Sequence, residues 1–229
     1  MNAPTNAGQI RLLPSLLLLT FMTGLVDAAS VLGLGHVFTA NMTGNVVFLG
    51  FALGGAHDVS IVASLIALAS FLAGAACGGR IARADDQGAL RIALVLELVL
   101  LLVAAGVAVY GDERAALTRD AILVLLAAPM GLQNAAVRRL AVPDMTTTVL
   151  TLTLTGIAAD SSLAGGKNPR LARRVGAVVS MLVGAVIGAL LMRRGLAWTI
   201  GGAATVHAAA LAALLSSSRR ADTELARPA

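Results

Sequence analysis

The stretch Gly24–Asn45, GLVDAASVLGLGHVFTANMTGN, decides the fold. It opens inside an apolar run that begins at Leu12, yet it contains Asp27 and four glycines, and it ends with three polar side chains, Asn41, Thr43 and Asn45. Polar groups are costly in hydrocarbon, so these side chains are expected to face a protein interior or a watery cavity. The stretch therefore predicts a membrane helix followed by an irregular polar element, with Gly24 and Gly44 allowing close helix contact or a helix break.

The composition of the 229-residue chain is that of a polytopic membrane protein. Hydrophobic residues make up 58% and charged residues only 13%, whereas a soluble domain carries roughly a quarter charged residues. The net charge of +5 comes from basic residues that lie between apolar runs. No nucleic-acid-recognition motif accompanies them, so we exclude a nucleic-acid partner and expect the lipid bilayer as the surroundings.

Eight apolar runs follow a polar start, and two of them, 38–56 and 145–165, are short or begin with polar residues. If all eight crossed the bilayer, the 17 basic residues would divide ten against seven. If these two runs instead enter and leave on one side, the division is thirteen against four. The positive-inside rule then favours six full spans, with both termini in the cytoplasm. The first run, although it imitates a signal peptide, is interpreted as a retained span.

An internal repeat supports this topology. GLVDAA at 24–29 matches GLQNAA at 131–136, an offset of 107, and SFLAGAACG at 70–78 matches SMLVGAVIG at 180–188, an offset of 110. We expect one membrane domain, 1–229, made of two repeats, 12–110 and 119–215, with flexible ends at 1–11 and 216–229. Three spans per repeat make the copies inverted, a plan common among transporters whose halves rock against each other. The alternative is that helices rich in glycine and alanine resemble one another by composition.

The fold class predicted is therefore all-α: a polytopic membrane helix bundle with six full spans, two broken or re-entrant helices and an inverted repeat. The motif Asn41-Met42-Thr43-Gly44-Asn45, together with the upstream Asp27 and the turn at 35–38, resembles the YoaK family of bacterial membrane proteins. The resemblance implies a small multi-spanning protein of the inner membrane, with a domain of unknown function. It supplies no catalytic residues.

The candidate site is a polar cavity shared by the two repeats. Asp27 is its sharpest member, because an intramembrane carboxylate needs a partner or water; it is expected to bind a proton or a cation, or else to lock two helices together. Polar residues at the start of a helix suit either a lined cavity or a satisfied cap. The residues expected to bind a small solute or ion are Asp27, Asn41, Thr43 and Asn45 in the first repeat and Gln133, Asn134 and Thr146 in the second.

Other side chains have structural interpretations. The alternation of threonines at 151, 153 and 155 has the period of a strand, but a helix or broken element is expected at this depth. Glu97 is placed to snorkel or to pair with an arginine near the inner face. It occupies the place equivalent to His207, at an offset of 110, so an interaction of the two is an alternative, although a lone intramembrane histidine more often only joins two helices. The basic residues Lys167, Arg170, Arg173 and Arg174 are expected to anchor a span against headgroups. Close helix packing is assigned to Gly24, Gly44, Gly74, Gly78, Gly184 and Gly188.

The sequence thus favours a small secondary transporter or permease over an enzyme. No catalytic triad, zinc motif or phosphate-binding loop is visible, and no cofactor or metal is expected. The alternative is a membrane scaffold without transport activity, in which Gly74, Gly78, Gly184 and Gly188 pack against partner helices or a second copy in a homodimer.

Overall fold

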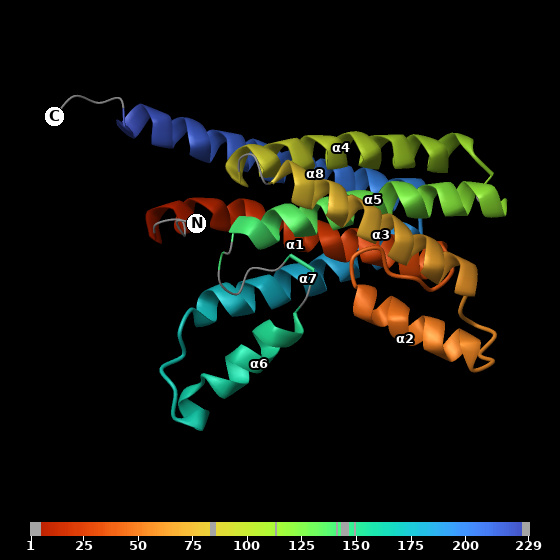
Figure 1. Cartoon of the computed structure of the whole chain (residues 1–229), viewed down its shortest axis with the longest axis horizontal. Helices are drawn as coiled ribbons and strands as arrows, with labels where there is room; N and C mark the ends of the chain where they lie inside the picture. Colours follow the sequence, from red (N-terminus) through yellow and green to blue (C-terminus); the bar gives the residue numbers. More distant parts are fainter. Residues whose placement is uncertain are drawn as a thin grey trace.

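The computed structural model describes residues 6–82, 86–112, 114–140, 142, 147–148 and 150–225. Over these residues the chain is helical, and the six helices long and apolar enough to cross a membrane confirm the predicted fold class. These long helices, drawn in Figure 1, are α1 (Asn6–Gly33), α3 (Ile61–Ile81), α4 (Asp86–Tyr110), α5 (Ala116–Leu140), α7 (Leu171–Met192) and α8 (Leu196–Leu225).

Two shorter helices occupy the runs that the charge distribution sets apart. α2 (Met42–Leu53) has 12 residues and α6 (Thr151–Ala159) has 9, followed by a 3₁₀ turn, Ser162–Ala164. At ~1.5 Å per residue they reach about 18 Å and about 14 Å, too short for a hydrocarbon core of ~30 Å. Both start near the middle of the bundle and diverge toward its opposite ends (Figure 1). The threonines of α6 are therefore helical, as expected.

The long helices pair in two close, glycine-lined contacts that cross the repeat boundary. A Cβ added at Gly184 of α7 would overlap the carbonyl oxygen of Phe21 in α1, and one added at Gly74 of α3 would overlap that of Ala128 in α5. The equivalences Phe21/Ala128 and Gly74/Gly184 follow the sequence offsets of 107 and 110. The same holds for Gly24 and Gly131, and for Gly78 and Gly188. The packing thus repeats where the sequence does.

These contacts correct the glycine-based scaffold hypothesis. Gly74, Gly78, Gly184 and Gly188 already hold α3 against α5 and α7 against α1, with backbone or methyl groups filling the space beside each of them. Small residues let helix backbones approach closely, and here the helices that approach belong to the same chain. They are therefore not free faces for a partner helix or a second copy.

The packing also shows that the two repeats are not two separate bodies. α1 packs against α7 and α8, and α5 packs against α3 and α4. One three-helix body, α1/α7/α8, thus takes one helix from the first repeat and two from the second, and the other, α3/α4/α5, is its counterpart. The main backbone contact between the bodies is that of α4 with α8.

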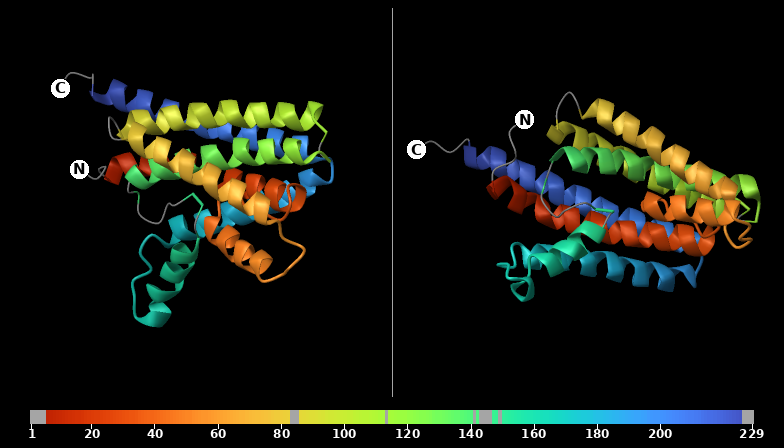
Figure 2. Two further views of the ribbon diagram at one scale, coloured as in Figure 1. Left: turned by 45° about the vertical axis from the view of Figure 1, so that its right-hand side comes forward. Right: turned by 60° about the horizontal axis from the view of Figure 1, so that its bottom comes forward.

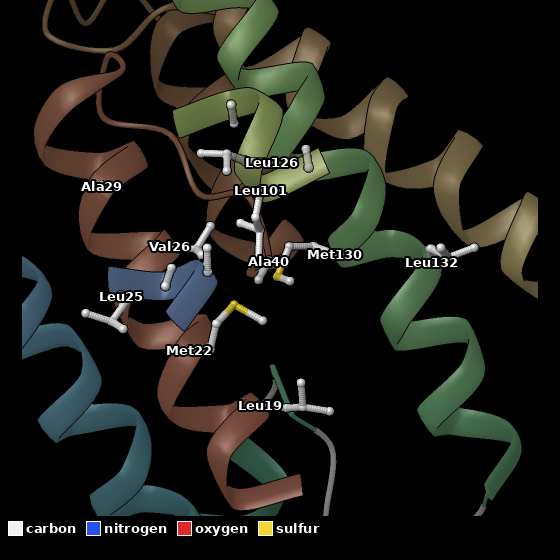
Figure 3. Packing of buried hydrophobic residues seen from close by; sticks show 14 of the residues in the cluster. Leu19, Met22, Leu25, Val26, Ala29, Ala40, Leu101, Leu126, Met130 and Leu132 are labelled. Atoms are coloured by element: carbon white, nitrogen blue, oxygen red, sulfur yellow. The ribbon is translucent and has the colours of Figure 1, made fainter. Parts of the chain in front are cut away.

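Buried apolar side chains fill the space between the helices. Met22 and Val26 of α1 and Met130 of α5 gather there (Figure 3), each at most 1% exposed. By contrast, Leu72 and Leu182, on the outer faces of α3 and α7, are 63% and 60% exposed. Apolar side chains in this position face the acyl chains of a bilayer.

Both ends of the chain lie at the same end of the bundle, where α1 begins and α8 ends (Figure 2). This agrees with an even number of crossings. Helix extends into both ends that the sequence marks as flexible, over residues 6–11 and 216–225. Once a span is formed, each further residue adds a hydrogen bond at little cost, which explains the extension beyond the apolar run.

Candidate functional site

Asp27 ties α1 to the segment that leads into α2. Its Oδ1 accepts hydrogen bonds from the backbone N–H of Thr39 and of Ala40, both at 3.1 Å, and from the Thr39 hydroxyl at 3.4 Å. The chain turns back toward α1 because Gly35 and His36, directly after the helix, have φ of 100° and 57°. Among the described residues no donor bonds Oδ2, which leaves this oxygen for the cavity that Asp27 lines.

Asn45 fixes the turn itself and does not line the cavity. Its side chain forms a two-way pair with the backbone of Phe38: Nδ2 donates to the Phe38 carbonyl at 2.6 Å, and the Phe38 N–H donates to Oδ1 at 2.8 Å. Asn45 is fully buried. Gly44 lies beneath the Phe38 ring, where a Cβ would come within 2.7 Å of it. The prediction that Asn45 faces a solute is therefore wrong, because both the oxygen and the nitrogen of its side-chain amide bond to the backbone of Phe38.

The second repeat makes an equivalent tie with different side chains. Asn134, at the position of Asp27, accepts a 2.6 Å hydrogen bond from the hydroxyl of Thr148, and its amide donates to the Met130 carbonyl at 2.8 Å. The neighbouring Gln133 donates to the Thr147 hydroxyl at 2.9 Å. Both amides hold the segment before α6, and neither lines the cavity as predicted. Thr146, also predicted for this site, lies outside the described residues.

A cavity of about 520 Å³ lies where the starts of α2 and α6 face each other. Its wall combines the ends of both short helices with the glycine-lined contact of α1 and α7. The lining residues that carry polar side chains are Asp27, Asn41, Thr43, Thr148 and Thr151. Phe38 and Phe48, stacked with ring centroids 5.7 Å apart, give it an aromatic side.

The structure thus brings together three of the predicted residues, Asp27, Asn41 and Thr43, and adds two that sequence reasoning missed. Thr148 and Thr151 could have been found from the repeat, since an offset of 107 carries Asn41 onto Thr148. Asn41 and Thr148 therefore occupy equivalent positions in the two repeats, and both line the cavity.

The first turn of α2 is not closed by a side-chain cap. Asn41 occupies the N-cap position, but its side chain makes no capping hydrogen bond, and α6 starts after Leu150, which has no capping group. The first backbone N–H groups of a helix lack partners within it, and together they carry a partial positive charge. The satisfied-cap interpretation of Asn41 is therefore wrong, and its amide stays available to the cavity.

Arg174 fastens α6 to α7. This buried side chain donates from Nη1 to the Gly156 carbonyl at 2.6 Å, and the same atom lies 2.8 Å from Oδ2 of Asp160. The Gly156 carbonyl also accepts from the backbone N–H of Asp160 at 3.2 Å, so the guanidinium adds a second hydrogen bond at the end of α6. For Arg174 the prediction of headgroup anchoring is therefore wrong, because the guanidinium is turned inward onto α6.

Each short helix bridges the two bodies. α2 packs against α3, while the segment before it is bonded to Asp27 of α1. α6 packs against α7, while the segment before it is bonded to Asn134 of α5. A relative movement of the bodies must therefore move both short helices and change the cavity between them.

No group of three or more potential metal ligands occurs in the part of the chain that the structure describes. The groups that line the cavity are a carboxylate, an amide, hydroxyls and backbone N–H groups, which can accept or hold a proton, neutralise a cation, and donate hydrogen bonds to a polar solute.

Comparisons with known proteins agree with the membrane architecture. Residues 15–214 match the model of the family described as "Protein of unknown function (DUF1275)". The chain is 38% identical over 162 residues to the UPF0700 transmembrane protein YoaK of Bacillus subtilis (strain 168), covering 69% of this chain and 70% of that protein. No solved structure matches the chain.

Proposed function

The chain belongs to the DUF1275 family of transmembrane proteins of unknown function, and from its geometry we propose that it is a small secondary transporter or permease of a small polar solute or ion. The observation that carries the proposal is the cavity of about 520 Å³ between the starts of two short helices, one from each repeat. Cavities of ~300–1,000 Å³ are the usual size for small-molecule sites. Broken helices that meet near the membrane midplane are a recurrent way to build a transport site.

The polar residues that line the cavity have different chemical roles. Asp27 is held by three donors on Oδ1 and offers Oδ2 to a proton, a cation or a donor group of the solute. Asn41, Thr43 and Thr151 supply an amide and hydroxyls that can donate or accept, and the Thr148 hydroxyl, which donates to Asn134, can still accept. Because Asn134 replaces the carboxylate in the second repeat, any proton or cation sensitivity of this cavity is carried by Asp27 of the first repeat.

Alternating access follows from the two bodies. α2 and α6 each connect both bodies, so a rocking of α1/α7/α8 against α3/α4/α5 opens or closes the cavity. Thirteen of the 17 basic residues fall at the end of the bundle where the chain starts and stops under the six-span topology. This supports an orientation with both termini in the cytoplasm, in a bacterial inner membrane.

The scaffold alternative has no comparable support. Its glycine faces are occupied within the chain, and a homodimer would need another surface. The expectation that the protein is not an enzyme stays a prediction.

The test is solute-induced thermal stabilisation of the purified protein across a library of small polar solutes and ions, with Asp27→Asn as the variant. Asparagine keeps an oxygen for the donors of Thr39 and Ala40, so the variant should fold. Asp58→Asn, the same chemical change at an exposed loop position, is the matched control. We expect a solute that raises the melting temperature of wild type and of Asp58→Asn, with at least about tenfold weaker binding to Asp27→Asn, equivalent to about 1.4 kcal/mol.

A stabilising solute should then cross proteoliposome membranes in the presence of wild-type protein. Loss of its flux in Asp27→Asn, and in Thr148→Val on the opposite wall, is the expected result. If both variants bind and move the solute like wild type, the cavity is not the transport site.

A further inference from the structure

The strongest unassigned feature is a buried pair of ionisable side chains, Glu97 in α4 and His207 in α8. Both are 0% exposed, and Nδ1 of His207 lies 3.8 Å from Oε2 of Glu97. The positions differ by 110, the repeat offset, so the pair lies where the two equivalent last spans meet. Of the alternatives that the sequence leaves open for Glu97, the structure shows the approach to His207.

The other ring nitrogen fixes the role of the histidine. Nε2 of His207 lies 2.7 Å from the carbonyl oxygen of Leu94. A carbonyl oxygen only accepts, so Nε2 carries a proton and donates it. In a neutral imidazole Nδ1 is then the acceptor, and it faces the carboxyl group of Glu97.

Within the described residues, the Glu97 carboxyl group and Nδ1 of His207 have no hydrogen-bond partner. Both carboxyl oxygens of Glu97 and Nδ1 of His207 are buried without a hydrogen bond. Other ionisable side chains do lie on the pair's own helices and on the helices packed against them, but no hydrogen bond or ion pair joins any of them to the pair. Among the described side chains they are Asp27 of α1, Cys77 and Arg80 of α3, Arg91 and Tyr110 of α4, Arg119, Asp120, Arg138 and Arg139 of α5, and Arg173 and Arg174 of α7.

We propose that Glu97 and His207 form an intramembrane proton-binding site, separate from the Asp27 cavity, that holds one proton between Oε2 and Nδ1. With that proton the pair is neutral overall, whether it is carried by the carboxyl group or by the imidazole. Removing it leaves a buried negative charge and adding another leaves a buried positive one, and each is strongly disfavoured away from water. The proton therefore exchanges only when water reaches the contact of α4 with α8.

This contact is the main one between the two bodies. A separation of α1/α7/α8 from α3/α4/α5 would admit water to the pair and would alter the cavity through α2 and α6. The coupling of proton exchange to solute movement rests on the proposed function, whereas the existence of the proton site does not.

The experiment is infrared spectroscopy of the protein in lipid, compared with Glu97→Gln and with the control Asp27→Asn. ¹⁵N NMR is recorded in parallel on protein labelled at histidine, with His36→Asn and His57→Asn so that only His207 reports. Glutamine keeps the shape of Glu97 and can still donate to Nδ1, but it has no exchangeable acid proton.

We expect a protonated-carboxyl band, or a histidinium signal paired with a carboxylate band, that vanishes in Glu97→Gln and persists in Asp27→Asn. We also expect Nε2 of His207 to be protonated and its Nδ1 resonance to shift in Glu97→Gln. Transfer to D₂O should replace the shared proton slowly. If Glu97→Gln does not fold, His207→Gln makes the same comparison from the other side, through a shift of the Glu97 band.

The proposal is overturned if neither variant changes these signals, or if the proton exchanges as fast as at an exposed side chain. Because no solute is needed, this result is independent of the proposed function. A protein that transports nothing can still show the proton site, and a transporter governed by Asp27 can lack it.

Discussion

Comparing the stability of Gly184→Ala, at the α1/α7 contact, with that of Gly176→Ala should distinguish the cost of overpacking from the effect of helix propensity. A Cβ at Gly184 would overlap the Phe21 carbonyl, whereas in the same helix a Cβ at Gly176 would meet only the end of Leu17, at 3.6 Å. Gly→Ala within a helix contributes about 0.5–1 kcal/mol through backbone entropy, and both variants gain it equally. Overpacking costs about 1–3 kcal/mol and falls on Gly184→Ala alone.

The difference between the two variants is therefore the packing term, about 1–3 kcal/mol in favour of Gly176→Ala. It is measured as the free energy of unfolding in a mixed-micelle titration, or as the shift in melting temperature of the purified proteins. The equivalence of the repeats sharpens the test: Gly74→Ala, which would overlap the Ala128 carbonyl, should lose as much as Gly184→Ala. Equal stability of Gly184→Ala and Gly176→Ala would refute the contact, and a silent Gly74→Ala would refute the equivalence.

Three further predictions concern the ends of the short helices and the topology. Asn45→Ala removes two hydrogen bonds to the Phe38 backbone and should lower the unfolding free energy by about 1–3 kcal/mol, whereas Asn41→Ala, which loses no cap bond, should change it by less than about 0.5 kcal/mol and weaken solute binding instead. Arg174→Gln should raise amide hydrogen exchange throughout α6, because the bond to its carbonyl is lost, and the exposed Lys167→Gln should not; unchanged exchange would count against this fastening. Single cysteines at Asp58 and Lys167, in a background with the native cysteine replaced by serine, should react with an impermeant thiol reagent from opposite faces of the membrane, while eight crossings would put both on one face.

The architecture was predictable because it depends on quantities that a sequence displays directly. Span number follows from run length and from the distribution of basic residues, and the runs 38–56 and 145–165 differ from the others both in their short or polar starts and in the charge division that they imply. The glycine positions identified which faces pack closely. They could not identify the partner, since a small residue at a helix surface accepts a helix of the same chain as readily as one of another.

The site was predictable only in part, because polar residues near a turn have two uses that composition does not distinguish. Asp27 and Asn41 line the cavity as predicted, whereas Asn45 and Asn134 are engaged with backbone or with a neighbouring hydroxyl. Which use prevails depends on the chain direction after α1, and the positive φ angles of Gly35 and His36 set that direction. The sequence indicates a turn at 35–38 but not the direction in which the chain leaves it, so the hydrogen bonds of Asn45 to the Phe38 backbone could not be predicted.

The packing of the helices also argues that the units which move are not the two sequence repeats but the two three-helix bodies. Halves that rock as sequence units would have to part α1 from α7 and α3 from α5, the contacts where glycines admit backbone against backbone. Such contacts are rigid because no side chain can rearrange within them. Under the proposed function, movement between α1/α7/α8 and α3/α4/α5 would leave them intact and would act mainly on the α4/α8 contact and on α2 and α6. The α4/α8 contact contains the Glu97–His207 pair, and α2 and α6 border the Asp27 cavity, so the proposed rocking motion would act on both sites although no residue is common to them.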